Sequence, residues 1–363
     1  VHSDFRRDIG MPRANLFFPL AALLPLPFLA LGPVFGGWFA FIALCYLSAF
    51  TFLVDESVEI TDAADHQTSR FGLLFADSIT ILLALAHLVL LPLAILAISG
   101  MDGLSIWENA LNFCAFGLFF GVISTANAHE LIHRTGRFRH TLGKWAFISI
   151  LFGHHVSAHL AVHHRHVATP LDPNTARLNE SFYSYFRRAW IGSFKSGLTA
   201  EARKLQRGLL SVHNPYVIYF AGAAVFLTLA FVLAGFKGLL IYLGFAVFAQ
   251  IQLLLSEYVQ HYGLERRILK GGVYEPVGLI HSWNAPHVFS AALMLNAPRH
   301  SDHHAHPSLQ YSELKTLSAQ GAPMLPRSLP VMSCIALAPA FWRRVMNPRV
   351  AAWFRQRDAM DQN

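Results

Sequence analysis

Long apolar stretches, separated by short turns or by polar segments, constrain the fold of this chain more than any other feature. A helix needs roughly 20 residues to cross the hydrocarbon core of a bilayer. Six stretches come close to that length or exceed it, and they predict six transmembrane helices. The expected boundaries are residues 16–31, 38–54, 71–98, 104–128, 215–236 and 239–259.

The composition agrees with a membrane protein and not with a soluble one. Of the 363 residues, 54% are hydrophobic and 13% are charged, whereas soluble domains contain about 25% charged residues. So few charges cannot cover the surface of a soluble protein of this size. Because no internal repeat or linker is visible, we expect one domain over residues 1–363, an all-α integral membrane protein.

Two further apolar runs are not expected to cross the bilayer. Residues 145–152 form a run that is too short to span. Residues 329–342 contain Pro330 and Pro339 and end in two arginines, which favours a position at the membrane interface.

The distribution of basic residues predicts the orientation of the chain. Lys237 is the only one of the 28 Lys and Arg residues in the short loops after the first, third and fifth stretches. By the positive-inside rule both termini then face the cytoplasm, as do residues 129–214 and 261–363, which form a histidine-rich cap. Topology therefore explains the net charge of +7, and we expect no nucleic-acid partner.

Histidine is the main functional signal. The chain has 20 His residues, and they cluster at residues 129–166 and 281–306. Three short boxes have helical spacing, which places imidazoles one turn apart on one helix face. The boxes, with one further histidine at the end of the sixth stretch, contain His129, His133, His159, His163, His164, His261, His300, His303 and His304.

Nine imidazoles at one membrane face exceed what a single ion can bind, so the pattern predicts a dinuclear metal site. Imidazole suits iron, copper, zinc and nickel, and the composition alone does not select among them. The first box also matches the H-E-x-x-H motif of zinc proteases, with Glu130 as the base. A zinc protease would need one further ligand and not the many additional histidines found here.

These motifs closely resemble those of the membrane-bound alkane 1-monooxygenases, which form one histidine-rich di-iron group with fatty acid desaturases and xylene monooxygenase. The resemblance covers nearly the whole chain. It rests on H-E-L-I-H-R at 129–134, H-x-x-x-H-H at 159–164, R-H-V-A-T-P-L-D-P at 165–173, Q-H-Y-G-L at 260–264, H-S-W-N at 281–284 and R-H-S-D-H-H-A-H-P at 299–307.

The resemblance implies that the nine histidines bind two non-haem iron ions, with no catalytic side chain beyond that centre. Glu130, Asp172 and Asp302 are expected to orient ligand imidazoles by accepting the other ring N–H. Four more histidines are assigned to supporting positions around the ligands: His154, His281, His287 and His306. We expect His140, His155 and His166 at the surface or the membrane interface.

The chain departs from the family pattern beside the sixth stretch. The family usually has Glu directly before His261 and Asn three residues earlier, whereas this chain has Gln260 and Glu257. The residue before His159 is often Glu and here is Ala158. Because Glu257 lies at i−4 from His261, we hypothesise that it takes over the orienting role that a carboxylate at position 260 would have.

By the same resemblance, the expected activity is O₂-dependent hydroxylation of a terminal methyl group of an alkane, in the inner membrane of a bacterium. No flavin or nicotinamide motif is present, so electrons come from a partner, rubredoxin, and from an NADH-dependent rubredoxin reductase. Basic residues of the cap are candidates to steer an acidic carrier. They are Arg187, Arg188, Arg203, Lys204 and Arg207.

Three alternatives stay open from the sequence. A xylene- or cymene-type hydroxylase would act on aryl methyl groups, and Gln260 also fits that branch. A fatty acid desaturase or hydroxylase is disfavoured by the second box, which has three residues before its His pair where desaturases usually have two. A non-catalytic metal or haem transporter is disfavoured because the histidines lie at span ends and not near the membrane midplane.

Overall fold

The structure, a computed structural model, describes residues 20–58, 70–101, 103–209, 211–315 and 321–360. Residues 16–19, the start of the first predicted span, lie outside the described residues. The described residues form helices and loops with two isolated β-bridges, Ile268–Tyr274 and Asn284–Met324. The all-α prediction is confirmed for this part of the chain.

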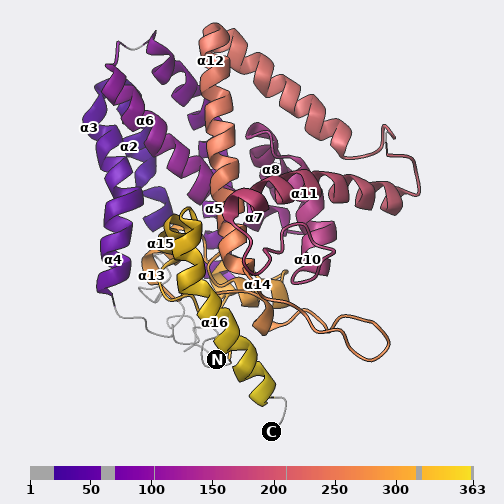
Figure 1. The fold of residues 1–363 in the computed structure, drawn as a ribbon. Coiled ribbons are helices and arrows are strands. Elements are labelled where there is room, and N and C mark those ends of the chain that lie inside the picture. The colour runs from indigo at the N-terminus through magenta and orange to yellow at the C-terminus, as the bar shows by residue number, and fades with distance from the viewer. Residues whose placement is uncertain (1–19, 59–69, 102, 210, 316–320, 361–363) are drawn as a thin grey trace, which may run out of the picture.

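The apolar segments form a bundle of long helices in the upper part of Figure 1. In hydrocarbon every backbone N–H and C=O must be paired within the segment, and a helix achieves this pairing. The α-helices are α2 Pro25–Phe35, α3 Gly37–Cys45, α4 Thr51–Ser57, α5 Arg70–Leu96, α6 Ile106–Leu118, α7 Thr125–Ile132 and α12 Tyr216–His261. The π-helical segments are η1 Tyr46–Phe50, η2 Ala97–Met101 and η3 Phe119–Ser124.

Among the described residues, four helical stretches are long and apolar enough to cross a bilayer, by length and composition. They are Gly37–Ser57, Gly72–Gly100, Ile106–Ile132 and Tyr216–His261. The stretch Leu20–Phe35 is apolar but shorter than these four. The helices overlap all six predicted segments, while the count of six crossings stays a prediction.

Helix α12 is interrupted near its middle. A straight helix of its 46 residues would be about 70 Å long, more than twice the roughly 30 Å of a bilayer core. Ala234 and Gly235 leave helical geometry, and the φ of +60° at Gly235 is one that glycine adopts without strain. The chain reverses direction at this point (Figure 1), between the two predicted segments 215–236 and 239–259.

The turns between the long helices gather at one end of the bundle. Ser105 caps α6 in a capping box with Glu108, and the Glu108 carboxylate also accepts a hydrogen bond of 2.9 Å from the N–H of Gly37. A Cβ atom at Gly100 would lie 3.3 Å from the ammonium nitrogen of Lys237. The turn at residues 36–37, Gly100, the cap of α6 at Ser105 and the reversal in α12 therefore share this end.

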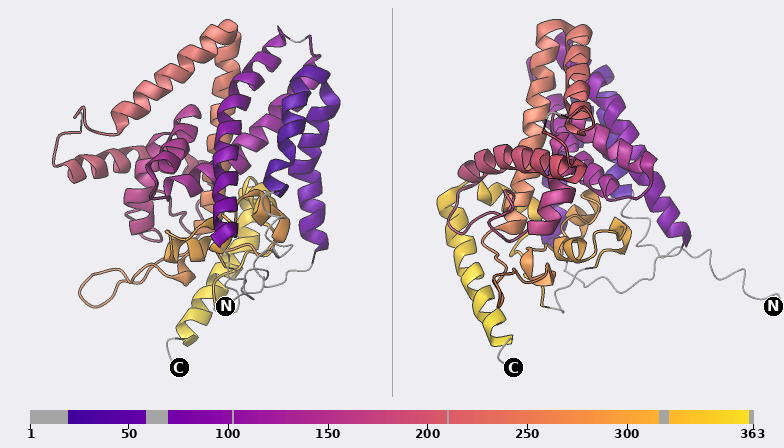
Figure 2. Two further views of the ribbon diagram at one scale, coloured as in Figure 1. Left: turned by 180° about the vertical axis from the view of Figure 1, so that it is seen from behind. Right: turned by 90° about the vertical axis from the view of Figure 1, so that its right-hand side faces the viewer.

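The remaining segments surround the opposite end of the bundle (Figure 2). They are α8 Arg137–Ser149, α9 His154–Ala158, the π-helical η4 His159–His163, α10 His164–His166, α11 Phe182–Leu205, η5 Leu279–His281, α13 Val288–Leu293, α14 His300–Ala305, η6 Tyr311–Glu313, α15 Leu329–Ala336 and α16 Pro339–Met360. The short apolar run 145–152 lies mostly in α8, where Phe147 and Ile148 are fully buried in the core. The run 329–342 is divided between α15 and α16.

Candidate metal centre

The nine predicted ligand histidines converge at the end of the bundle away from the turns. They come from the end of α7, from η4 and α10, from the last residue of α12 and from α14. Their nitrogen atoms form two groups, within each of which one atom per residue lies within 4.8 Å of all the others. The five-histidine group is His129, His133, His159, His164 and His303, and the four-histidine group is His163, His261, His300 and His304.

The spacing of the Nε2 atoms fits metal ligands. In the five-histidine group, the Nε2 atom of His159 lies 2.8 Å from that of His129 and 2.9 Å from that of His164. In the four-histidine group, the Nε2 atoms of His300 and His261 are 2.9 Å apart. Two nitrogens that each lie about 2.1 Å from one ion are about 3.0 Å apart at a right angle. Each group therefore has the spacing of neighbouring ligands around one ion, so the residues fit two ions.

The second box owes its geometry to a π-helical turn. Segment η4 spans His159–His163, and its wider turn brings His159 beside His164, at i+5. His163, at i+4, joins the other group. Ordinary helical spacing, which we expected for this box, would have placed His159 and His163 together in one group. One local change in helix type thus distributes the box over both groups.

The third box also contributes histidines to both groups, but it does so from one turn of an ordinary α-helix. In α14, His300 and His304 lie one turn apart, with their Nε2 atoms at 3.1 Å. His303 lies between them in sequence and faces the five-histidine group, with its Nε2 atom 3.2 Å from that of His164. Helix α14 therefore holds the two groups together.

Asp172 orients one of these histidines from the side remote from the cluster. The Nδ1 atom of His163 lies 2.9 Å from Asp172 Oδ2, which also accepts a hydrogen bond from the Thr175 hydroxyl. Asp172 is 2% exposed, so this hydrogen bond lies in the protein interior. A carboxylate on Nδ1 turns the Nε2 lone pair toward the cluster.

Burial keeps most of these imidazoles neutral, the form that binds metal. Desolvation holds the pKa of each of the following well below its usual value: His133, His155, His159, His164, His300, His303 and His304. His163 differs, because the carboxylates of Asp172 and Glu257 outweigh its burial and raise its pKa to about 9. A bound cation would take the place of that proton.

Glu130 and Asp302 do not contact ligand imidazoles, contrary to the expected orienting role. The Glu130 carboxylate pairs with Arg134 and accepts a hydrogen bond of 3.1 Å from the N–H of Tyr311. Asp302 bonds to Nδ1 of His306 at 2.8 Å and to the N–H of Lys315 at 2.8 Å. Both carboxylates tie the cap segments together around the cluster, a task that the motif spacing could not indicate.

Neither Gln260 nor Glu257 contacts the Nδ1 atom of His261, which is the contact that an orienting residue would make. The Gln260 amide donates to the carbonyl of Ala297 and accepts from the Ser256 hydroxyl. Glu257 Oε2 lies 3.5 Å from Nε2 of His163 and 4.0 Å from Nε2 of His261. These are the nitrogens that face the cluster, so the geometry is not that of a carboxylate accepting the remote ring N–H.

The four histidines assigned to supporting positions lie outside both groups. His154 packs between Phe152 and the helix α11, and its pKa falls to about 4 because it is buried. His281 bonds to Glu275 at 2.9 Å, and His287 precedes α13. His306 is largely exposed and bonds to Asp302.

His155 is a residue of the site that the sequence analysis placed at the surface. It is 1% exposed, and one of its nitrogens lies within 4.8 Å of donor atoms of His159 and Glu257. The sequence did contain an indication of this position, because His155 lies four residues before His159, about one helical turn away. The other two histidines expected at the surface or interface, His140 and His166, are half-buried.

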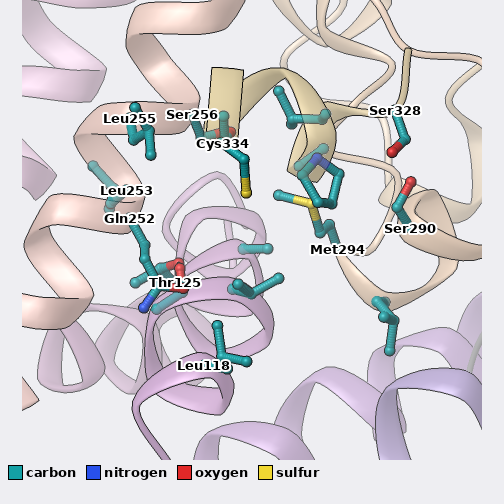
Figure 3. Close-up of a pocket in the computed structure, with 18 of the residues that line it drawn as sticks. Leu118, Thr125, Gln252, Leu253, Leu255, Ser256, Ser290, Met294, Ser328 and Cys334 are labelled. Carbon is teal, nitrogen blue, oxygen red and sulfur yellow. The ribbon is translucent and has the colours of Figure 1, made fainter. Parts of the chain in front are cut away.

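An apolar cavity of about 690 Å³ adjoins the cluster. Figure 3 shows part of its lining, with Leu118 and Thr125 on the chain that leads to His129, and Met294 and Cys334 facing them. Its polar end includes His129, His155, Glu257 and His300. Thr125 and Phe248 line this cavity, whereas Ile123 and Leu254 are buried elsewhere in the core.

Two known proteins with similar sequences are alkane 1-monooxygenases. The chain is 33% identical over 243 residues to alkane 1-monooxygenase 2 of Alcanivorax borkumensis, which covers 66% of this chain and 63% of that protein. It is 34% identical over 253 residues to alkane 1-monooxygenase 2 of Pseudomonas aeruginosa, covering 68% and 66%. The matched region thus spans slightly less than two thirds of these relatives.

A third relative matches over a longer region at lower identity. The chain is 26% identical over 351 residues to the xylene/toluene monooxygenase hydroxylase component XylM of Pseudomonas putida, which covers 89% of this chain and 86% of that protein.

Helices long and apolar enough to cross a bilayer, with two histidine groups at one end that could each hold a metal ion, are the features of a membrane protein with a candidate non-haem metal site. The chain belongs to the fatty acid desaturase family, whose profile matches residues 105–336. The match includes all three histidine boxes and the cavity wall around Leu118.

Proposed function

We propose that this protein is a di-iron monooxygenase of the bacterial inner membrane that converts a terminal methyl group of an alkane to a primary alcohol. The observation that carries the proposal is the junction of an apolar cavity with two histidine groups. An alkane has no polar handle, so shape and apolar contact must place its terminal carbon beside the metal site. The similarity to two alkane 1-monooxygenases supports this substrate class.

The side chains of this protein would hold, orient and shield the metal site. The five- and four-histidine groups would each bind one iron ion, and Asp172 would orient His163. Bound iron would supply the oxidation of an unactivated C–H bond, which no side chain can perform. The reaction consumes one alkane, one O₂, two electrons and two protons, and yields one alcohol and one water.

The two electrons require a partner, for which we propose rubredoxin reduced by an NADH-dependent reductase. Arg187, Arg203, Lys204 and Arg207 are exposed on and just beyond α11 and could steer an acidic carrier. Arg188 is less suited to this role, because it bonds to the Glu180 carboxylate and to the carbonyls of Pro173 and Thr175.

A second candidate function is hydroxylation of an aryl methyl group. It is favoured by the similarity to the xylene/toluene monooxygenase component, which extends over 89% of this chain. The cavity also has polar lining residues, among them Ser290, Ser328 and Gln252 (Figure 3), so it is not lined by aliphatic side chains alone.

The test is a product assay with purified full-length protein in lipid nanodiscs. The protein is loaded with iron, supplied with rubredoxin, reductase and NADH, and given n-alkanes of several lengths or p-xylene. Gas chromatography should detect 1-alkanols, with incorporation of ¹⁸O from ¹⁸O₂. A methylbenzyl alcohol as the main product would favour the second candidate, and alkenes would indicate a desaturase. No oxygenated product from either substrate would contradict both monooxygenase proposals.

A further inference from the structure

The carboxylate of Glu257 is the one acidic group aimed at the metal-facing side of the four-histidine group, among the described residues. Its Oε2 atom lies 3.5 Å from His163 Nε2 and 4.0 Å from His261 Nε2. Both nitrogens belong to the four-histidine group. Glu257 is 7% exposed, and Oε2 has no hydrogen-bond partner. A buried carboxylate oxygen without a partner is costly unless a cation compensates it.

The distances match those between two ligands of one ion. Two donors each about 2.1 Å from an ion are about 3.4 Å apart at the tetrahedral angle. Glu257 lies close to that separation from His163, and it is farther from both nitrogens than an ordinary hydrogen bond. The Glu257 carboxylate therefore lies at ligand-to-ligand distance from two of the four histidines, His163 and His261, and one of its oxygens also lies within 4.8 Å of donor atoms of His155 and His159.

Glu257 cannot orient His163 or His261 through their Nδ1 atoms, because those atoms face other groups. The Nδ1 atom of His163 already bonds to Asp172 at 2.9 Å. The Nδ1 atom of His261 lies 3.5 Å from the Ser282 hydroxyl. Glu257 can reach only the Nε2 sides of these two rings, where the ion would be bound.

Ligand number and charge point to the same role. One group has five imidazoles and the other has four, so one carboxylate would give both ions five protein ligands. Neutral imidazoles leave the full charge of a divalent ion uncompensated in a buried site, and a carboxylate lowers that charge by one.

We propose that Glu257 is a direct carboxylate ligand of the metal ion held by His163, His261, His300 and His304. This inference rests on the proposed binding of two ions. It assigns a mixed nitrogen and oxygen environment to one ion and an all-nitrogen environment to the other. Because Glu257 also lines the apolar cavity, the ion with the carboxylate ligand would be reached directly from the cavity.

The experiment compares iron binding and iron spectra of full-length variants in nanodiscs. Wild type, Glu257→Gln and Glu257→Asp are loaded anaerobically with ⁵⁷Fe²⁺. Iron per chain is then measured after a chelator challenge, and Mössbauer spectra of the ferrous proteins are recorded. Asp172→Asn is the matched control, because that carboxylate acts on the same His163 through the opposite nitrogen.

In Glu257→Gln we expect one iron per chain to be released at least about 100-fold more readily. Its quadrupole doublet should change or disappear while the other doublet stays. Glu257→Asp, which keeps the carboxylate, should restore part of the binding. Asp172→Asn should weaken binding by about 10–100-fold, the usual cost of losing such an orienting partner, with both doublets in their original positions.

Two outcomes would overturn the inference. Wild-type release rates and both wild-type doublets in Glu257→Gln would show that Glu257 is not a ligand, while leaving two bound ions intact. Fewer than two irons per chain in the wild type would contradict the two-ion proposal itself, and the inference with it. If Glu257→Gln does not accumulate, an unchanged spectrum and release rate in Glu257→Asp would count against a direct bond.

Discussion

At the scale of single residues, histidines adjacent in the sequence lie in different histidine groups. His303 and His304 are adjacent in α14, yet the first lies in the five-histidine group and the second in the four-histidine group. Successive helical residues point about 100° apart, so adjacent imidazoles cannot face one ion equally. A box of three histidines is therefore divided by helix geometry.

This division predicts that His303→Ala and His304→Ala each remove about one of two bound irons, and not both. Metal analysis of the purified variants would measure the loss, and loss of turnover should accompany it. The control is His306→Ala, since the His306 imidazole is largely exposed and pairs with Asp302 outside both histidine groups; it should keep both irons. Full iron content in the His303 or His304 variant would contradict the ligand assignment.

At the scale of elements, the π-helical segment η4 explains how the second box brings His159 and His164 into the same histidine group. Three residues separate His159 from the His pair, and the π turn brings His159 and His164 together at i+5. A π turn is what an α-helix forms when it accommodates one extra residue. With one residue fewer, the same two imidazoles would be at i+4 in an ordinary helix and would still meet.

Deletion of Leu160, which lies at the exposed side of η4, should therefore convert the segment to α-helix and keep about two irons per chain. Metal analysis and circular dichroism of the purified protein would check this. Leu160→Ala is the matched control, because it removes the side chain without changing the register. If the deletion loses iron while Leu160→Ala keeps it, the π turn itself is required.

A second element-scale feature joins the end of α7 to the cap. Arg134 pairs with Glu130 and donates to the carbonyls of Ser308 and Leu309. The ion pair is mostly buried, with side-chain exposures of 13% and 7%. Removing one partner of a buried pair leaves the other charge uncompensated.

Arg134→Met should therefore destabilise the protein by about 3–5 kcal/mol, the usual cost of breaking a buried pair. Thermal unfolding in detergent would show a lower midpoint. Arg327→Met is the comparison, because its pair with Glu56 is more exposed and such pairs contribute about 0–1 kcal/mol. Equal midpoints for the two variants would argue against the structural role of Arg134.

At the scale of the whole molecule, the turns and the histidine groups lie at opposite ends of the bundle. The bend of α12 and the turns near Gly36 and Gly100 share one end, with Lys237 exposed there. The cap helices and the cluster share the other end (Figure 1). The basic residues other than Lys237 belong to the segments at the cluster end or outside the described residues.

This asymmetry predicts that the cluster faces the cytoplasm. In a variant without Cys45, Cys114 and Cys334, an impermeant thiol reagent should label Lys237→Cys in intact cells. It should label Arg203→Cys and Arg355→Cys only after the membrane is opened. Labelling of Arg355→Cys in intact cells would mean that the region near α15 crosses the membrane, and that the prediction of six spans is wrong.

The sequence by itself determined the features that depend on local periodicity and composition. Apolar stretches of sufficient length must form helices in a bilayer, because nothing else there pairs their backbone groups. The i, i+4 spacing of His129 and His133 placed both in one group, since an α-helix repeats every 3.6 residues. The grouping of nine histidines at one end followed from their positions at the ends of predicted spans or in the predicted cap.

Only the tertiary structure decided which histidines share an ion and which carboxylates face them. The π turn at His159 redirects His163, and no residue pattern predicted that change in helix type. The Glu130 carboxylate accepts a hydrogen bond from the N–H of Tyr311 because two segments distant in sequence pack there. Glu257 faces the Nε2 atoms of His163 and His261 because α12 and η4 meet at that point. The packing of two helices cannot be read from the periodicity of either one.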